Sequence, residues 1–408
     1  MRVISVEQLK SIFENLPNNP RVVASGNFAT PHTLLSAFDS SVAEYRLNML
    51  NAQPGIPDRA GVTYESSFVG AGMRRHSSLQ YVPSRLSMVP VLLRDHFIPK
   101  VVLLHTSVNH EGKVSLGTEV NVMPAAIASV RANGGIVVAQ GNLQMPYTFG
   151  DAEISEYDID YLVEVDEALE VKPKAPIGEV ARLIGERISS QVPDGSTLQL
   201  GIGGIPDSVI DQLGNRKGLR IWTEMFSDGV LGLQQKGALD AETPITASFV
   251  FGSRELYDWL HLNPRVRMLR SETTNDPGLI AKQPLMTSIN AALEVDLFDQ
   301  ANASHVRGEI YSGFGGSTDF IVGAMHASGG RSFMALPSWH EKANKSTIVE
   351  RLSEHVTSFQ HSFVATEQGL AACFGRSQGE QAWNLINHAA HPDAREYLTE
   401  AAKAKKLF

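Results

Sequence analysis

The chain has almost no cysteine, no long apolar run and a modest share of charged residues, and each scarcity excludes a class of protein. A single cysteine, Cys373, among 408 residues excludes an intrachain disulfide, so nothing indicates an oxidising compartment. No apolar run approaches the roughly 18 residues that a membrane-spanning helix needs. The N-terminal segment MRVISVEQLKSIFENL is polar and lacks the apolar core of a signal peptide. We therefore expect a cytoplasmic protein without a membrane partner.

The charge balance argues against a second class, the nucleic-acid-binding proteins. The formal net charge is −9, whereas such proteins concentrate positive charge. Hydrophobic residues make up 43% and charged residues 19%, which is typical of a folded globular chain and unlike a disordered one. An acidic protein that binds an anion must therefore supply positive potential locally, and helix N-termini with their backbone N–H groups can do so.

The organisation of the chain predicts an α/β fold. Short apolar, β-branched runs are typical of strands buried in parallel sheets, and helical patterns follow several of them. Repeated strand–helix units imply a layered α/β architecture. The predicted strands are 21–25, 101–105, 135–139 and 197–200, and the predicted helices include 124–133 and 177–191.

A linker is predicted at Val171-Lys172-Pro173-Lys174-Ala175-Pro176, where two prolines and two lysines separate periodic segments. It divides the chain into an N-terminal domain, 1–172, and a C-terminal domain, 173–408, both of ordinary domain size. A faint repeat supports two related halves. Gly26 to Pro31 and Gly201 to Pro206 share the spacing Gly-x-x-x-x-Pro, and each lies between a predicted strand and an apolar helix pattern.

Two other groups of reactive side chains have structural interpretations. The flank of Cys373, Gly369-Leu370-Ala371-Ala372, is read as packed helix, so the thiol is expected to be a small buried apolar group. His388, His391 and Asp393 are close in sequence and could ligate a metal. Pro392 breaks their helical face and no HExxH or CxxC motif accompanies them, so we predict no metal site.

A glycine-rich turn, Gly201-Ile202-Gly203-Gly204-Ile205-Pro206-Asp207, is the first candidate for chemistry. It follows a predicted strand and precedes the helix pattern that begins near Ser208. Glycines allow close backbone approach, and the helix N-terminus behind them favours negative charge. A phosphate or a developing oxyanion would suit this turn, and a plain tight turn would explain it equally well.

A carboxylate, Glu224, is the second candidate. It lies in Thr223-Glu224-Met225-Phe226-Ser227-Asp228-Gly229, after the apolar Ile221 and Trp222. A strand that ends in Thr-Glu places the carboxylate at the carboxyl edge of a sheet, where α/β sites usually lie. A partly desolvated carboxylate can act as base or nucleophile. By itself, however, such a glutamate is more often a helix cap or an ion-pair partner.

A third glycine-rich segment, Tyr311 to Phe320, contains Gly313, Gly315 and Gly316 and predicts a backbone-lined pocket or a strained loop. It follows Met286-Thr287-Ser288-Ile289-Asn290. The amide of Asn290 could contact a ligand or hold a turn, and the sequence favours neither.

In this order, the segments resemble the acetyl-CoA hydrolase/transferase family, which includes 4-hydroxybutyrate, butyrate and acetate CoA-transferases. The resemblance covers nearly the whole chain and rests on many ordered matches, since no single motif would carry it. The matching segments are 107–117, 144–146, 158–164, 201–207, 223–229, 251–258, 288–290, 294–297, 313–320 and 391–393.

The resemblance implies two similar open α/β CoA-transferase-like domains with the active site between them, and self-association as a homodimer or larger homo-oligomer. It implies that Glu224 is the catalytic nucleophile. Acyl-CoA and small carboxylic acids are the implied substrates, with no permanently bound cofactor. The residues implied to contact coenzyme A are Gly201, Ile202, Gly203, Gly204 and Ile205, with Asn290 and Gly313 as further positions.

The implied activity is CoA transfer from a short-chain acyl-CoA to a carboxylic acid by ping-pong steps through a glutamyl-CoA thioester. Hydrolysis of acyl-CoA by the same residues is an alternative. A non-catalytic CoA-binding sensor and a sugar-phosphate isomerase are remoter ones. The chain departs from the common family pattern at Ser317, Asp299 and Gln368, which we expect to affect acyl specificity or pocket water.

Overall fold

The computed structural model describes residues 1–172, 176–201, 203–354, 356 and 360–408 and divides into two compact units. The first unit consists of residues 1–173, 245–274 and 310–315, and the second of 174–244, 275–309 and 316–408. A single cut after residue 172 does not describe this packing, because two later segments join the first unit. Strand pairing is one reason: β17 (Val266–Met268) lies parallel to β9 (Phe149–Gly150).

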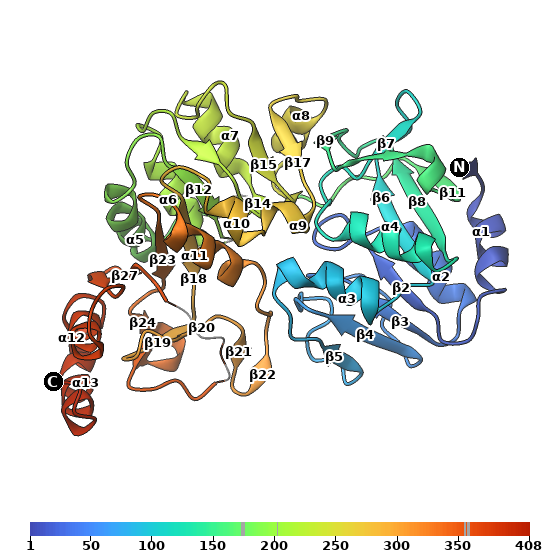
Figure 1. The fold of residues 1–408 in the computed structure, drawn as a ribbon. Coiled ribbons are helices and arrows are strands. Elements are labelled where there is room, and N and C mark those ends of the chain that lie inside the picture. Colours follow the sequence, from blue (N-terminus) through green and yellow to red (C-terminus); the bar gives the residue numbers. More distant parts are fainter. Residues whose placement is uncertain (173–175, 202, 355, 357–359) are drawn as a thin grey trace. The chain divides into compact units, whose positions relative to one another are not determined.

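An eight-stranded sheet forms the first unit, and all its neighbouring strands are parallel (Figure 1). Across the sheet the strands are β1 (Arg2–Val3), β11 (Tyr161–Val165), β8 (Ile136–Asn142), β6 (Val101–Thr106), β2 (Arg21–Ala24), β3 (Tyr45–Asn48), β4 (Val62–Ser66) and β5 (Leu79–Tyr81). The helices of this unit are α1 (Val6–Phe13), α2 (His32–Ser41), α3 (Val89–Asp95), α4 (Met123–Ala132), α8 (Arg254–Leu260) and α9 (Ser271–Thr274).

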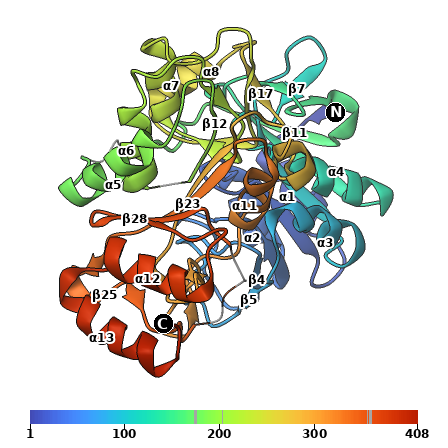
Figure 2. The same ribbon diagram turned by 60° about the vertical axis from the view of Figure 1, so that its left-hand side comes forward.

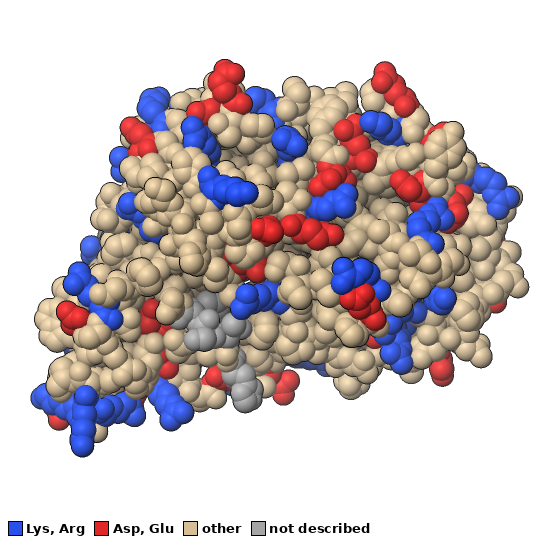
Figure 3. All heavy atoms as spheres, in the orientation of Figure 1, with Lys and Arg blue, Asp and Glu red and all other residues tan. Residues whose placement is uncertain are grey.

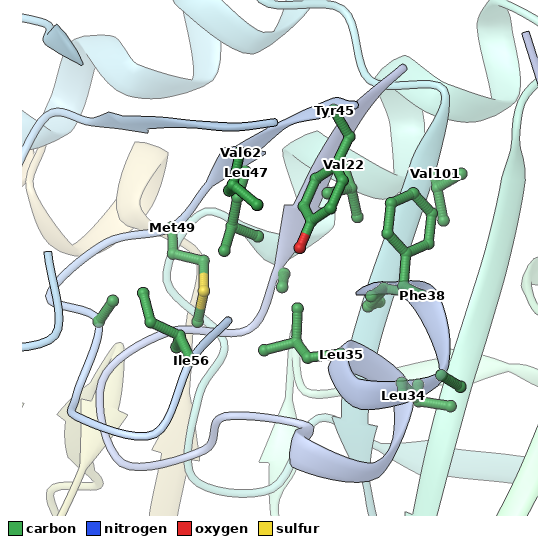
Figure 4. Packing of buried hydrophobic residues seen from close by; sticks show 14 of the residues in the cluster. Val22, Leu34, Leu35, Phe38, Tyr45, Leu47, Met49, Ile56, Val62 and Val101 are labelled. Atoms are coloured by element: carbon green, nitrogen blue, oxygen red, sulfur yellow. The ribbon is translucent and has the colours of Figure 1, made fainter. Parts of the chain in front are cut away.

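The core of the first unit lies between its sheet and α2 (Figure 4). Leu34, Leu35 and Phe38 recur at helical spacing, so one face of α2 is apolar and buried. The ring of Phe38 meets Tyr45 of β3 edge to face, with 5.0 Å between the ring centroids. Side chains along a strand alternate between the two faces of a sheet. The buried side chains of β2 and β3 that point toward α2 therefore pack against its apolar face.

A six-stranded sheet forms the second unit. Its strands, in order, are β13 (Arg220–Ile221), β12 (Thr197–Leu200), β18 (Thr287–Ala291), β23 (Arg331–Ala335), β27 (Phe363–Thr366) and β28 (Gly369–Ala372). All neighbours are parallel except β28, which is antiparallel to β27. The helices are α5 (Glu179–Ser190), α6 (Gly204–Gln212), α7 (Asp228–Gln235), α10 (Pro277–Ile280), α11 (Ser317–His326), α12 (Gln378–His388) and α13 (Pro392–Ala404), of which Figure 2 shows α12 and α13 side by side.

Short elements complete the chain. The remaining strands are β7 (Lys113–Ser115), β10 (Glu153–Ser155), β14 (Met225–Phe226), β15 (Ile245–Ala247), β16 (Phe249–Val250), β19 (Glu294–Asp296), β20 (Ala301–Asn302), β21 (His305–Val306), β22 (Glu309–Ile310), β24 (Trp339–His340), β25 (Lys345–Ser346) and β26 (Ile348–Val349). Three single turns of 3₁₀ helix are Leu86–Met88, Glu156–Asp158 and Glu341–Ala343.

The predicted α/β fold is confirmed. The predicted strands correspond to β2, β6, β8 and β12, and the predicted helices to α4 and α5. The prediction of helix before Cys373 was wrong, because Gly369–Ala372 forms the edge strand β28. Gly-Leu-Ala-Ala has no decisive periodicity, so pairing with β27 decided its conformation. Cys373 itself is fully buried in the second unit's core, as predicted.

Basic and acidic side chains are interspersed over most of the face in Figure 3, and basic ones gather where α13 ends. Lys403, Lys405 and Lys406 lie at that end of the helix, where cations interact favourably with its dipole. Lys403 and Lys405 are paired with Glu400 and Glu350. Among the described residues, no helix is long and apolar enough to cross a membrane.

Candidate functional site

The carboxyl edge of the second unit's sheet contains a topological switch point between β12 and β18. From β12 the chain continues to β13 on one side, and later strands are added on the other side, beginning with β18. Loops that leave such a pair of strands diverge in opposite directions, and ligands of open α/β sheets bind in the resulting crevice. The predicted glycine turn follows β12, Glu224 follows β13, and Asn290 lies near the end of β18.

The glycine turn is tightly packed at its start and open at its end. The N–H of Gly201 donates to the Ile289 carbonyl at 3.0 Å, and a Cβ on Gly201 would lie 3.1 Å from that oxygen. Gly203 has φ of +119°, a conformation that residues with a side chain rarely adopt. Around Gly203 and Gly204 a Cβ would meet no atom within 4 Å. These glycines therefore leave open space at the N-terminus of α6.

Ile205 is half-buried in the first turn of α6, so the structure brings it beside Gly203 and Gly204. Ile202, which was predicted with them, lies outside the described residues. The helix behind this turn has nine residues and carries Asp207 in its first turn. The backbone N–H groups at the start of this helix and its dipole favour negative charge at this edge of the sheet, and Asp207 offsets part of that effect.

The carboxylate of Glu224 accepts a hydrogen bond from Asn275 and packs against the backbone of Gly316. Asn275 donates from Nδ2 to Oε2 of Glu224 at 3.0 Å. A Cβ on Gly316 would lie 1.8 Å from the same Oε2 and 2.3 Å from the Asn275 Nδ2 atom. Only glycine at position 316 therefore leaves room for this arrangement. Gly316 is also the N-cap residue of α11, so the carboxylate lies at a helix N-terminus.

Electrostatics distinguish Glu224 from an ordinary surface glutamate. Burial raises its pKa to about 7; the hydrogen bond from Asn275 lowers the pKa, and the nearby charge of Asp319 raises it. The side chain keeps some solvent contact, but protein atoms displace much of its hydration shell. A carboxylate that ionises near neutral pH is more basic than usual, and weak hydration leaves it available to attack a carbonyl.

Asn290 is buried in a polar network below the glycine turn. Its Nδ2 atom donates to the Ser288 hydroxyl at 2.9 Å and to Oε1 of Gln199 at 3.3 Å. The Ser288 hydroxyl donates to the same Gln199 oxygen at 2.7 Å. Asn290 thus joins side chains of two neighbouring strands, β12 and β18, and holds no turn; its contact with a ligand stays a prediction.

The third glycine segment is divided between the two units. Gly313 belongs to the first, where a Cβ would lie 2.4 Å from the Ser67 carbonyl oxygen, so its packing requires glycine. Gly316 belongs to the second, beside Glu224. The second unit therefore contains Glu224, Gly201, Gly203 to Ile205 and Asn290, while the role predicted for Gly313 stays a prediction.

Sequence reasoning missed two residues at this site. Asn275 lies in Thr273-Thr274-Asn275-Asp276-Pro277, which reads as an ordinary helix start, since Asp276 caps α10. Gly316 stood in the glycine-rich segment, but three glycines in four positions gave no reason to select it. In both cases the signal is spatial, because the contact to Glu224 joins segments far apart in the chain.

The other reactive clusters have structural roles. The Nδ1 atom of His391 accepts a hydrogen bond from the N–H of Asp393 at 3.3 Å and so caps α13. Among the residues that the structure describes, no group of three His, Cys, Asp or Glu side chains could hold a metal ion. Burial raises the pKa of the Cys373 thiol well above its usual range, and Asp299 reinforces this.

The fold and the site first define a class of protein: an α/β protein in which a poorly hydrated carboxylate and a glycine turn follow neighbouring strands of one parallel sheet. Family models then match it in both parts, the acetyl-CoA hydrolase/transferase N-terminal domain at residues 11–171 and the C-terminal domain at 252–402. The chain belongs to the acetyl-CoA hydrolase/transferase family, a family of enzymes, as the sequence predicted.

Individual relatives agree with this assignment. The chain is 35% identical to a succinyl-CoA:acetate/propanoyl-CoA:succinate CoA transferase of Fasciola hepatica, over 96% of this chain and 86% of that protein. It is 32% identical to a 4-hydroxybutyrate coenzyme A transferase of Clostridium kluyveri, over 99% and 98%. Among solved structures, RipA of Yersinia pestis matches with a TM-score of 0.92 at 27% identity, covering 100% of this chain and 98% of RipA. A 4-hydroxybutyrate CoA-transferase of Porphyromonas gingivalis matches with 0.83 at 31%, covering 99% and 98%.

Proposed function

We propose that this protein is a CoA-transferase that moves coenzyme A between a short-chain acyl-CoA and a carboxylic acid, with Glu224 as its covalent nucleophile. One observation carries the proposal. The Glu224 carboxylate lies at the switch-point edge of a parallel sheet, poorly hydrated and oriented by Asn275, in the unit that also holds an open glycine turn. The relatives named above, CoA-transferases by name, support the choice of reaction.

The first half-reaction transfers CoA to the enzyme. Ionised Glu224 attacks the acyl-CoA carbonyl, and the thioester bond breaks to give an acyl-glutamyl anhydride and CoA thiolate. The thiolate then attacks the glutamyl carbonyl, which releases the first carboxylate and leaves a glutamyl-CoA thioester. The thioester's free energy is thereby kept on the enzyme.

The second half-reaction reverses these steps with a new acid. Its carboxylate attacks the glutamyl thioester, expelling CoA thiolate and forming a new anhydride. The thiolate attacks the acyl carbonyl of that anhydride, which releases the new acyl-CoA and free Glu224. Each attack passes through an oxyanion, and we assign its stabilisation to backbone N–H groups near Gly203 and Gly204, around which a Cβ would meet no atom within 4 Å. Ping-pong kinetics follow from this order.

Coenzyme A is therefore a substrate in this proposal, and no permanently bound cofactor is needed. The residues proposed to contact it are Gly201, Ile202, Gly203, Gly204 and Ile205, with Asn290 and Gly313 as further positions. Self-association and a cytoplasmic location stay predictions. Sedimentation of the purified protein tests the first of these.

Intact-mass measurement after addition of acyl-CoA tests the nucleophile. We expect the protein to gain the mass of CoA less one water, on the peptide that contains Glu224, and hydroxylamine to remove the adduct. Glu224→Ala should form no adduct, whereas Glu400→Gln, a change on the exposed face of α13, should form it normally. Turnover by folded Glu224→Ala at the wild-type rate would refute the proposal.

Acyl-CoA hydrolysis is the second candidate, because proteins named acetyl-CoA hydrolase are also among the relatives, including one of Saccharomyces cerevisiae that is 31% identical over 57% of this chain and 47% of that protein. The same carboxylate would serve, with water attacking the glutamyl thioester. Release of CoA with and without an added carboxylate decides the question. Dependence on the carboxylate indicates transfer, and equal rates indicate hydrolysis.

A further inference from the structure

The residue before the proposed nucleophile, Thr223, is fully buried, and its hydroxyl group makes two short contacts with backbone. The Oγ1 atom accepts a hydrogen bond from the N–H of Leu200 at 3.1 Å. It also lies 2.8 Å from the Met225 carbonyl oxygen and 3.4 Å from the Leu200 carbonyl oxygen. A hydroxyl has one proton, and the nearer Met225 oxygen is its acceptor.

The positions of these partners in the chain give the contacts their meaning. Leu200 is the last residue of β12 and directly precedes the glycine turn. Thr223 and Met225 flank Glu224 on both sides. One hydroxyl group therefore ties the backbone around the nucleophile to the point from which the glycine turn begins.

The strand pairing explains why a side chain is needed here. Strands β12 and β13 pair through Thr197 with Arg220 and Leu198 with Ile221, and the N–H of Trp222 continues the ladder to Leu198 at 3.1 Å. A regular parallel ladder would next offer the Leu200 N–H a backbone carbonyl of the neighbouring strand. The Thr223 hydroxyl takes that N–H instead, so the chain can leave the sheet at Glu224 while the bond is kept.

We propose that Thr223 is a positioning residue that fixes Glu224 relative to the glycine turn, an inference that rests on the proposed role of Glu224. Thr223 acts through its backbone contacts and touches no reacting atom. Covalent catalysis requires the attacking oxygen and the oxyanion donors to keep one geometry through successive steps. A buried hydroxyl shared by both segments supplies that constraint.

Three variants test this role. Thr223→Val keeps the shape of the side chain and removes the hydroxyl, while Thr223→Ser keeps the hydroxyl and removes the methyl group. Thr197→Val is the matched control. Thr197 lies at the other end of β12 from Leu200, and its buried hydroxyl donates to the Pro284 carbonyl at 2.8 Å. The measurement is the rate of adduct formation at saturating acyl-CoA, by rapid-quench intact mass, with the melting temperature recorded for each variant.

We expect Thr223→Val to slow adduct formation by about 10- to 100-fold, because misplaced reacting groups lose that much. Thr223→Ser should stay close to the wild-type rate, and Thr197→Val should lose stability but no rate. If Thr223→Val is as fast as wild type, or slows no more than Thr197→Val, the positioning role is wrong. Should the valine variant not fold, a tenfold or greater loss in folded Thr223→Ser would overturn the proposal by itself.

The outcomes separate this inference from the proposed function. If Glu224→Ala still forms the adduct, the nucleophile is misassigned whatever Thr223 does. If Glu224→Ala forms none and Thr223→Val forms it at the wild-type rate, the nucleophile stands and only the positioning role fails.

Discussion

The two units contain the same kind of switch point, but among the described residues the glycine loop of the second has more room around it. In the first unit the chain runs from β2 to β3, β4 and β5 on one side and adds β6, β8 and β11 on the other. The loop Gly26 to Pro31 follows β2 and leads into α2, as Gly201 to Pro206 follows β12 and leads into α6. The repeat seen in the sequence thus occupies the corresponding place in both sheets.

The first unit closes its switch point with its own side chains. The Nδ2 atom of Asn27 donates to the buried carboxylate of Glu119 at 2.7 Å, and Asn51 donates to Oδ1 of Asn27 at 2.9 Å. A Cβ on Gly26 would lie 2.1 Å from the Leu50 carbonyl oxygen. In the second unit the matching first glycine, Gly201, also lies close to a neighbouring carbonyl, at 3.1 Å from a Cβ placed on it, but Gly204 faces open space where the first unit has the buried Ala29. Topology therefore locates a possible site, and the side chains around it decide whether a ligand can enter.

Among the experiments that test this difference between the two units, removal of the Glu224 charge is expected to have the largest effect. Glu224→Gln should lower turnover by about 10⁶-fold, as loss of a covalent nucleophile does elsewhere. It should also stabilise the protein at pH 8 by about 1–3 kcal/mol, because burial opposes the charged form. Steady-state kinetics and urea unfolding measure the two effects. A variant that is slower and no more stable at pH 8 would contradict the assigned burial of the charge.

The sign of the stability change follows from the raised pKa. Since the folded pKa of Glu224 is near 7 and the usual value is 4.5, the folded state binds the proton more tightly. This contribution is present below the unfolded value and is lost as pH rises through 7. The stability gain of Glu224→Gln should accordingly vanish near pH 4.5.

The pH dependence of adduct formation is the next largest effect. Only ionised Glu224 attacks, so the rate should rise with pH to a plateau with a midpoint near 7. At pH 5 it should be about 100-fold below the plateau. Pre-steady-state mass measurements on protein shown to be folded at each pH provide the test. A midpoint near the usual glutamate value would mean that Glu224 is well hydrated.

One glycine substitution in each loop, Gly204→Ala and Gly26→Ala, tests the difference in room around the two loops. Gly204→Ala should leave the melting temperature unchanged and lower kcat/KM by about tenfold, because the methyl group enters space left for a ligand. Gly26→Ala should instead cost about 3 kcal/mol of stability, because its methyl group meets backbone. If both variants lose stability alike, the open and closed loops are not as different as described.

The smallest expected effect concerns a hydrogen-bond network in the first unit that joins α2, β8 and the segment after β11. Glu167 accepts hydrogen bonds from Thr33 and from Nε2 of Gln140 at 3.0 Å. Glu167→Ala would leave the buried Gln140 amide without that acceptor and should cost about 1–3 kcal/mol in urea unfolding. Thr33→Val, which removes the other donor, should cost less because its hydroxyl is only partly buried. Equal stability of Glu167→Ala and wild type would show that the network contributes nothing to the stability of the first unit.

Sequence patterns were sufficient for the fold class and for the regular elements around the switch points. Residues 101–104 and 136–139 are unbroken apolar runs, as expected for strands that are buried on both faces of a parallel sheet. Sequence patterns were insufficient for Gly369–Ala372, where local preferences are weak. They were also insufficient for the segments 245–274 and 310–315, which belong to the first unit although they lie later in the chain. Such packing depends on contacts between residues that are distant in the chain.

The site shows the same division. The sequence by itself determined the residue types: a carboxylate after a strand, glycines able to adopt positive φ, and a family pattern that joins them. Tertiary structure alone decided that Asn275 and Gly316 converge on Glu224, that burial raises its pKa, and that one glycine loop stays open while the other is closed. The reason is physical: hydration and steric room depend on which distant atoms surround a group, and local sequence does not encode those neighbours.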